Sequence, residues 1–178
     1  MKMKRGPYTK NLINAITEGL LGYLIYLSRT GMQEAYSEYL LYDPIIRIAK
    51  DKGWEIKSEY PTDNKTTSGD KKRIDFLFKS SNDQSKVIGL EVKYIKTENK
   101  MIDFKKDSIK LEELKNHVKY KSLEGFILIA GRLSRESIKT ILNKNRAHLM
   151  SENVYTESYF KSQFIKNYGV ATCQVIVL

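Results

Sequence analysis

The amino-acid sequence predicts an α/β fold in which a central mixed β-sheet is flanked by α-helices. Residues 125–131, GFILIAG, form a continuous apolar run, which is typical of a strand buried on both faces. An alternating run at 86–94 and a helical pattern at 107–121 precede it, so the three segments together predict a βαβ crossover. Because 178 residues suit one core and no long linker divides the chain, we expect a single domain over 1–178.

The N-terminal part of the chain is predicted to be helical. Residues 11–28 carry apolar side chains at helical spacing, namely Ile13, Ile16, Leu20, Leu24 and Leu27. A second helix is expected over 32–52, and Gly53 ends it. Its apolar stripe consists of Leu41, Ile45, Ile48 and Ala49. Pro44 falls inside this pattern, so it either kinks the helix or starts a new one capped by Asp43.

Three strands are predicted next, at 54–60, 73–79 and 86–94. The polar segment SSNDQS between the last two consists of turn-forming residues, which predicts a β-hairpin. Alternation puts three apolar residues of each hairpin strand on one face, first Ile74, Phe76 and Phe78, then Ile88, Leu90 and Val92.

The C-terminal segment, 134–178, is expected to contain two helices and a final strand. Ser134 can cap the first of these helices. The second helix is predicted near 156–168, ending at Gly169, and a strand at 171–177 follows it.

Composition restricts the classes of function. The net charge of +10, from 31 Lys and Arg against 21 Asp and Glu, favours a polyanionic partner or reflects a lysine-rich solvated surface. The single cysteine, Cys173, excludes an internal disulfide and a cysteine-based zinc site. The apolar stretch GLLGYLIYL is too short to span a bilayer, and no cleavage site follows the basic N-terminus. We therefore expect a soluble, cytoplasmic protein without a membrane partner.

The candidate site consists of three charged residues of the hairpin, Asp75, Glu91 and Lys93. With a turn centred near Asp83, residues 75 and 91 lie directly opposite each other, and such side chains have Cβ atoms about 4.5–5.5 Å apart. Two carboxylates at that distance repel each other unless a cation lies between them, and a divalent ion meets this need. Lys93 extends from the same face as Glu91. The pattern favours a hydrolytic metal site, with a plain ion pair between Asp75 and Lys93 as the alternative.

The spacing of Asp75, fifteen residues and the tripeptide EVK at 91–93 resembles the motif of the PD-(D/E)XK nuclease superfamily. The resemblance covers roughly residues 34–131, and Ile74 stands where the name of the family has proline. It implies a restriction-endonuclease-like core, in which a central hairpin carries the motif. A helix then leads from the EXK strand to a buried strand, which is the order predicted here.

Other acids are placed by the same comparison and by their local context. The family often carries a further acid on the helix before the first core strand, and Glu38 matches that place. Glu34, one turn earlier on the same inward face, is the competing candidate. Glu59 is expected to be a surface residue at a strand end, and Asp103 and Asp107 are expected to be connector and helix-cap residues.

The expected chemistry is hydrolysis of a phosphodiester bond with Mg²⁺ or Mn²⁺ as cofactor. Such ions take hard oxygen ligands, so Asp75 and Glu91 are the expected ligands, and the resemblance adds the backbone carbonyl of Val92. Lys93 would orient or deprotonate the attacking water or stabilise charge on the phosphate, and Glu38 would contact the metal or its water. We expect a DNA endonuclease. A catalytically inactive nucleic-acid-binding or assembly module on the same fold is the alternative.

Basic residues flank the candidate site at the ends of both hairpin strands. They are Lys71, Lys72 and Arg73 before the first acid, and Lys96, Lys100, Lys105 and Lys106 after the EXK strand. This clustering predicts contacts to phosphates, with DNA preferred over RNA as the partner, although each lysine alone also fits a solvated surface. A homodimer and a partner protein both remain open, because the sequence marks no interface.

Overall fold

The computed structural model describes residues 7–30, 32, 37–65, 71–83, 85–96, 104–116, 120, 122–131, 134–144, 159–165 and 169–177. The helices are α1 (Pro7–Arg29), the 3₁₀ helix η2 (Glu38–Leu41), α2 (Tyr42–Asp51), α3 (Phe104–Asn116) and α4 (Arg135–Lys144). The strands are β1 (Trp54–Lys65), β2 (Lys71–Ser80), β3 (Val87–Ile95), β4 (Leu123–Gly131), β5 (Tyr159–Ile165) and β6 (Gly169–Val177).

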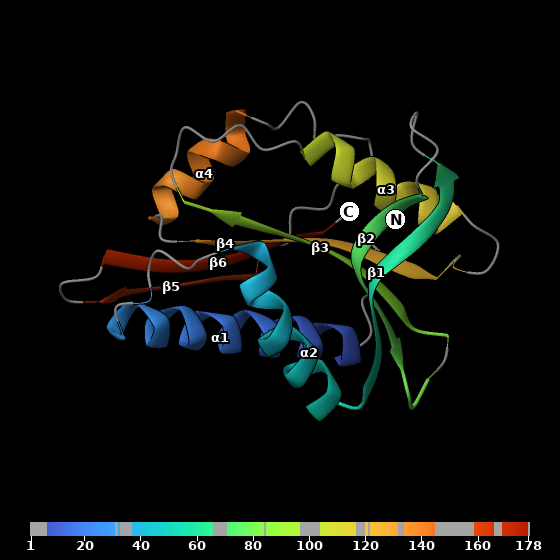
Figure 1. The fold of residues 1–178 in the computed structure, drawn as a ribbon, viewed down its shortest axis with the longest axis horizontal. Helices are drawn as coiled ribbons and strands as arrows, with labels where there is room; N and C mark the ends of the chain where they lie inside the picture. The colour runs from blue at the N-terminus through green and yellow to red at the C-terminus, as the bar shows by residue number, and fades with distance from the viewer. Residues whose placement is uncertain are drawn as a thin grey trace.

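The described strands form one mixed sheet in the order β1-β2-β3-β4-β6-β5. β3 and β4 are parallel, and α3 lies between them along the chain. The other neighbouring strands are antiparallel. Figure 1 shows α1 and α2 on one face of the sheet and α3 and α4 on the other. The predicted α/β fold, with a mixed sheet flanked by helices, is therefore confirmed.

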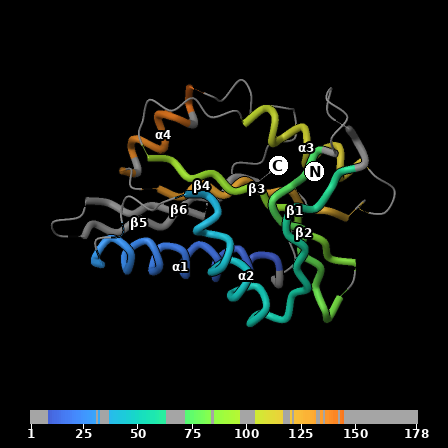
Figure 2. The backbone as a smooth tube through the Cα atoms, viewed as in Figure 1, coloured from blue at the N-terminus to red at the C-terminus, as the bar shows by residue number. Residues whose placement is uncertain are grey.

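The first apolar core lies between the sheet and the helices α1 and α2, which run on the same side of it (Figure 2). All five residues of the predicted stripe in the first helix are buried here, because α1 turns one apolar face to the sheet. Three of the four predicted stripe residues of the second helix are also buried, Leu41, Ile45 and Ala49. The strands contribute Phe76, Phe78, Ile88, Leu90 and Val92.

The second apolar core lies under α3 and α4 on the opposite face. Leu111 and Leu114 of α3 are buried in it, as predicted. Gly89 allows α3 to approach β3 closely, because a Cβ atom at this position would lie 2.8 Å from Cδ2 of Leu111. The Ser137 N–H donates to Oγ of Ser134 at 3.0 Å, so the predicted cap of α4 is confirmed. This packing brings Asp107 and Lys110 of α3 into contact with β3.

The predicted helix near 156–168 is wrong for the part of it that the structure describes. Residues 159–165 form the strand β5, which pairs antiparallel with β6 at the edge of the sheet. Phe160 and Phe164 are four residues apart, a spacing that fits one helical turn and two strand repeats equally well. The free edge of β6 and the preference of aromatic residues for strands explain the outcome.

The second predicted helix, 32–52, is divided where it is described. η2 is followed directly by α2, and Pro44 lies in the first turn of α2, where no N–H is needed. Asp43 does not cap this helix, because its carboxylate pairs with Nε of Arg47 at 2.8 Å. Gly53 follows the helix with a φ of 73°, a left-handed conformation that suits glycine, so the predicted end is confirmed.

None of the helices that the structure describes is both long and apolar enough to cross a bilayer.

Two glycines give a matched test of how closely β3 and β4 approach each other. Gly131 ends β4 beside Ile95 of β3, and a Cβ atom there would collide with the Ile95 carbonyl oxygen. Gly22 lies in α1 with nothing within 4 Å of its Cβ position. We expect Gly131→Ala to lower the free energy of unfolding by about 1–3 kcal/mol, and Gly22→Ala to raise it by about 0.5–1 kcal/mol. Urea unfolding measures both, and equal effects of the two substitutions would contradict this packing.

Candidate active site

The regular alternation of side chains between the two faces of the sheet is interrupted at neighbouring positions of β1 and β2, and we call this interruption the change of face. In β2, Phe76 packs towards α1 and α2 while Ile74 packs in the core under α3. The predicted common face of the β2 apolar residues is therefore wrong at Ile74. In β1, Ile56 and Tyr60 divide between the same two cores. Between them Glu59 has a φ of 49°, which is uncommon for a residue other than glycine.

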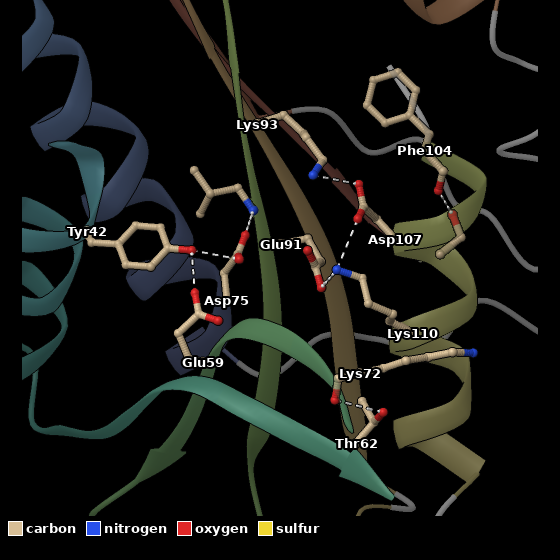
Figure 3. A network of polar contacts seen from close by, with 12 residues as sticks. Tyr42, Glu59, Thr62, Lys72, Asp75, Glu91, Lys93, Phe104, Asp107 and Lys110 are labelled. Atoms are coloured by element: carbon tan, nitrogen blue, oxygen red, sulfur yellow. Dashed lines mark hydrogen bonds and ion pairs between the residues drawn. The ribbon is translucent and has the colours of Figure 1, made fainter. Parts of the chain in front are cut away.

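Asp75 lies at this change of face, between Ile74 and Phe76 of β2, whose partners in β1, Tyr60 and Ser58, flank Glu59. Two donors hold its carboxylate (Figure 3). The backbone N–H of Val92 donates to Oδ2 at 2.6 Å, and the hydroxyl of Tyr42 donates to Oδ1 at 2.7 Å. The same hydroxyl lies 3.2 Å from Oε1 of Glu59. Burial raises the pKa of Tyr42, and the hydrogen bond to Asp75 adds to the rise, so the hydroxyl remains a donor.

Asp75 and Glu91 are neighbours, as the predicted hairpin register requires. The β2–β3 ladder ends at the pair Phe76↔Leu90, and one further step would place Asp75 opposite Glu91. The Asp75 carboxylate takes a backbone N–H of β3 at this point. Its negative charge acts on Glu91 and helps to raise the pKa of that residue. The two acids therefore belong to one electrostatic site.

Glu91 is almost fully buried, with 1% of its surface exposed, on the face of β3 that α3 covers. Nζ of Lys110, from α3, lies 2.6 Å from Glu91 Oε1. The other oxygen, Oε2, is buried and has no hydrogen-bond partner among the described residues. Burial raises the pKa of Glu91 to about 8, and the Asp75 charge adds to the rise, while Lys110 opposes it. The site thus contains a buried acceptor that is available to a further ligand.

Lys93 and Lys110 share the carboxylate of Asp107. Nζ of Lys93 lies 3.0 Å from Oδ2, and Nζ of Lys110 lies 3.1 Å from Oδ1 (Figure 3). Burial by itself lowers the pKa of Lys93, but the charges of Asp107 and the other nearby acids outweigh it and raise the pKa. The Lys93 ammonium therefore stays charged at neutral pH, with Asp107 rather than Asp75 as its ion-pair partner.

The expected role of Asp107 as a simple helix-cap residue is wrong. It does lie in the first turn of α3, but only 3% of it is exposed and its carboxylate binds two lysines. Asp103, the other residue of this expectation, lies outside the described residues.

Glu38 reaches the same strand from the side of α1 and α2. It is half-buried at the start of η2, and its Oε1 accepts a long hydrogen bond of 3.4 Å from the Tyr94 N–H. Its charge is among those that raise the pKa of Lys93. The structure thus gathers Glu38, as well as the two acids and the lysine of the hairpin, around β3. The competing Glu34 lies outside the described residues.

The predicted phosphate-binding residues lie around this site where they are described. Lys72 is half-buried and pairs with Glu113 of α3 at 2.9 Å. The side chain of Lys71 and all of Lys100 lie outside the described residues. The remaining four have exposed side chains, Arg73, Lys96, Lys105 and Lys106.

Sequence reasoning missed two contributors, Tyr42 and Lys110, although each carries a detectable signal. Tyr42 is one helical turn after Glu38, so following the inward face of that helix by four residues reaches it. Asp107 is one turn before the buried Leu111, so extending the predicted stripe of α3 backwards places this acid inward, with Lys110 beside it.

The residues fit a single divalent ion that takes few ligands from the protein. Within the part of the chain that the structure describes, no three His, Cys, Asp or Glu side chains are close enough to hold a metal by themselves. Mg²⁺ needs only one or two carboxylates, because water and substrate phosphate complete its shell. Asp75 and the unpartnered oxygen of Glu91 are the carboxylates that could hold such an ion. The Val92 carbonyl points to the same side of β3 as its N–H, towards Asp75.

Comparisons with known proteins assign no family to this chain. No protein-family model matches it, and no curated protein is detectably similar to it. The function is therefore argued from the residues of the site.

The raised pKa of Glu91 predicts a pH-dependent stability. The folded state binds the Glu91 proton more tightly than the unfolded state, so the free energy of unfolding falls as pH rises from about 4.5 to about 8. Glu91→Gln removes this component. We expect the stability of the variant relative to wild type to increase with pH across this window, by up to about 1.4 kcal/mol per pH unit.

Urea unfolding in EDTA at several pH values measures this difference. Glu55→Gln, at an exposed position of β1, is the matched control for the loss of one carboxylate. A difference for Glu91→Gln that does not change with pH would contradict the buried, proton-binding environment of this acid.

Proposed function

We propose that the chain is a metal-dependent DNA endonuclease of the PD-(D/E)XK superfamily, with a restriction-endonuclease-like core. The observation that carries the proposal is the buried, unpartnered oxygen of Glu91 beside Asp75 and the charged Lys93. The order of elements supports it, because two antiparallel pairs, β1–β2 and β2–β3, lead through α3 to the parallel strand β4.

Asp75, Glu91 and the Val92 carbonyl would hold Mg²⁺ or Mn²⁺ in this proposal. A bound ion supplies a Lewis acid for the phosphate and lowers the pKa of a bound water. The protein prepares its ligands in advance, because Tyr42 and the Val92 N–H fix the Asp75 carboxylate. Glu38, on the other side of β3, would orient the water.

Lys93 acts as a cation in this mechanism. Its raised pKa keeps the ammonium protonated, so it stabilises negative charge that grows on the phosphate as water attacks and the P–O bond breaks. Of the roles that the sequence leaves to Lys93, deprotonation of water is the least supported. Asp107 is a positioning residue, since its carboxylate holds the ammonium at 3.0 Å.

The basic residues support nucleic acid as the substrate, and we propose DNA. Exposed cations lie at the end of β3 and in the first turn of α3, beside the acids of the site. A net charge of +10 adds long-range attraction for a polyanion.

One observation favours the rival function, a nucleic-acid-binding module without catalysis. The Lys110 ammonium lies 2.6 Å from Glu91, so the buried acid has a cation beside it without a metal ion. On this reading the charged network is a structural feature of the core, and the basic surface alone carries function.

Cleavage of labelled duplex DNA, single-stranded DNA and RNA with Mg²⁺, Mn²⁺ or EDTA tests the proposal. We expect metal-dependent cutting of DNA, reduced about 10²–10³-fold in Lys93→Ala because a transition-state cation is lost. Asp107→Asn should lose about 10–100-fold, because Lys93 is then poorly held. Lys57→Ala, an exposed position of β1, is the control and should retain the wild-type rate.

Wild-type cutting by Lys93→Ala would exclude this residue from the chemistry. Absence of cutting by the wild-type protein with every divalent ion, together with salt-sensitive binding of DNA, would establish the binding module instead.

A further inference from the structure

A cleft of about 210 Å³ opens on the surface between β2 and α3. Four of its lining residues are lysines, and the fifth is the half-exposed Ile109. The lysines are Lys72, Lys105, Lys106 and Lys110. No carboxylate of a described residue lines the cleft. A surface hollow lined by four lysine side chains, with no acid among its described lining residues, is suited to an anion.

The cleft is joined to the candidate active site by one side chain. Lys110 lines the cleft and also places its Nζ 2.6 Å from Oε1 of Glu91. An anion in the cleft therefore lies no farther from Glu91 than about the length of one lysine side chain. Figure 3 shows Lys110 extending from α3 to Glu91, and Lys72 extending in the opposite direction, towards α3.

Charge and size together restrict what the cleft can hold. Lys72 is neutralised by Glu113, and Lys110 by Glu91 and Asp107, whose carboxylates all lie outside the cleft wall. The side chains of Lys105 and Lys106 are exposed. Sites that enclose a drug-sized ligand measure about 300–1,000 Å³. The smaller cleft suits a phosphate group, and Ile109 offers an apolar surface to the adjoining sugar.

We propose that this cleft binds a phosphate group of the substrate strand next to the phosphate that is cleaved. This inference extends the proposed function and rests on it, because it assumes that a DNA strand is cleaved at the candidate active site. A phosphate in the cleft would hold the DNA strand in place relative to Glu91. Lys110 links the two sites, because it lines the cleft and contacts Glu91. The phosphate belongs either to an internal diester or to a strand terminus, and the two sources are distinguished below.

Binding of fluorescein-labelled short DNA in EDTA, followed by fluorescence anisotropy, tests the inference without any cleavage. The variant is Lys105→Gln/Lys106→Gln. The matched control is Lys50→Gln/Lys52→Gln, which removes two exposed charges near the end of α2, on the opposite side of the sheet. We expect the cleft variant to bind about tenfold more weakly or worse, with a salt dependence shallower by about 1–2 in its logarithmic slope. The control should bind like wild type.

The DNA is used with and without a terminal phosphate. If the wild-type protein binds both DNAs with equal affinity, the cleft holds an internal diester. If a terminal phosphate tightens binding by the wild-type protein but not by the cleft variant, the cleft holds a strand end. Both results support the inference. Wild-type affinity in the cleft variant, an equal loss in the control, or no binding of DNA by the wild-type protein would each overturn it.

Failure of the proposed function gives a different result. If the cleft variant loses binding while the wild-type protein cuts nothing, the phosphate site stands and the nuclease proposal falls. Thermal unfolding of both double variants at the wild-type midpoint verifies that the fold is intact.

Discussion

The burial of Glu91 is the constraint on which the rest of the candidate site depends. A carboxylate with 1% exposure cannot rely on water for its charge, so it needs either a proton or a cation. The raised pKa of Glu91 favours the proton at neutral pH, and Lys110 is the nearby cation when the acid ionises. Asp107 holds Lys110 and Lys93 together. Carboxylates and ammonium groups thus alternate along a chain of ion pairs, in the order Glu91, Lys110, Asp107 and Lys93. The position of the expected catalytic lysine follows from the burial of the acid two residues before it.

The change of face in β1 and β2 brings the second acid into this site. Regular alternation would place Ile74 and Phe76 on the same face of the sheet, but the two residues lie in different apolar cores. Asp75, between them, accepts a hydrogen bond from the backbone of β3. Glu59 absorbs the change in β1 with its left-handed conformation. Such conformations cost roughly 1–3 kcal/mol and concentrate at functional sites. The change of face in β1 and β2 therefore also accounts for the placement of Asp75 beside β3.

The hairpin was predictable because its alternation and turn residues set the register that places Asp75 near Glu91. Local patterns were insufficient elsewhere. A charged residue in the first turn of a helix suggests a cap, and only packing of α3 on β3 shows that Asp107 is buried. Phe160 and Phe164 fit helix and strand equally, and the edge of β6 decides between them. The sequence predicts local period well, but long-range contacts determine which charges meet.

Binding of Mn²⁺, followed by the loss of the paramagnetic signal of the free ion, tests the account most directly. We expect one bound ion for each wild-type chain and no such site in Glu91→Gln or Asp75→Asn. Asp51→Asn, at an exposed position near the end of α2, should bind like wild type. Undiminished binding by Glu91→Gln, or no binding by the wild-type protein with or without DNA, would contradict a metal site at the buried acid.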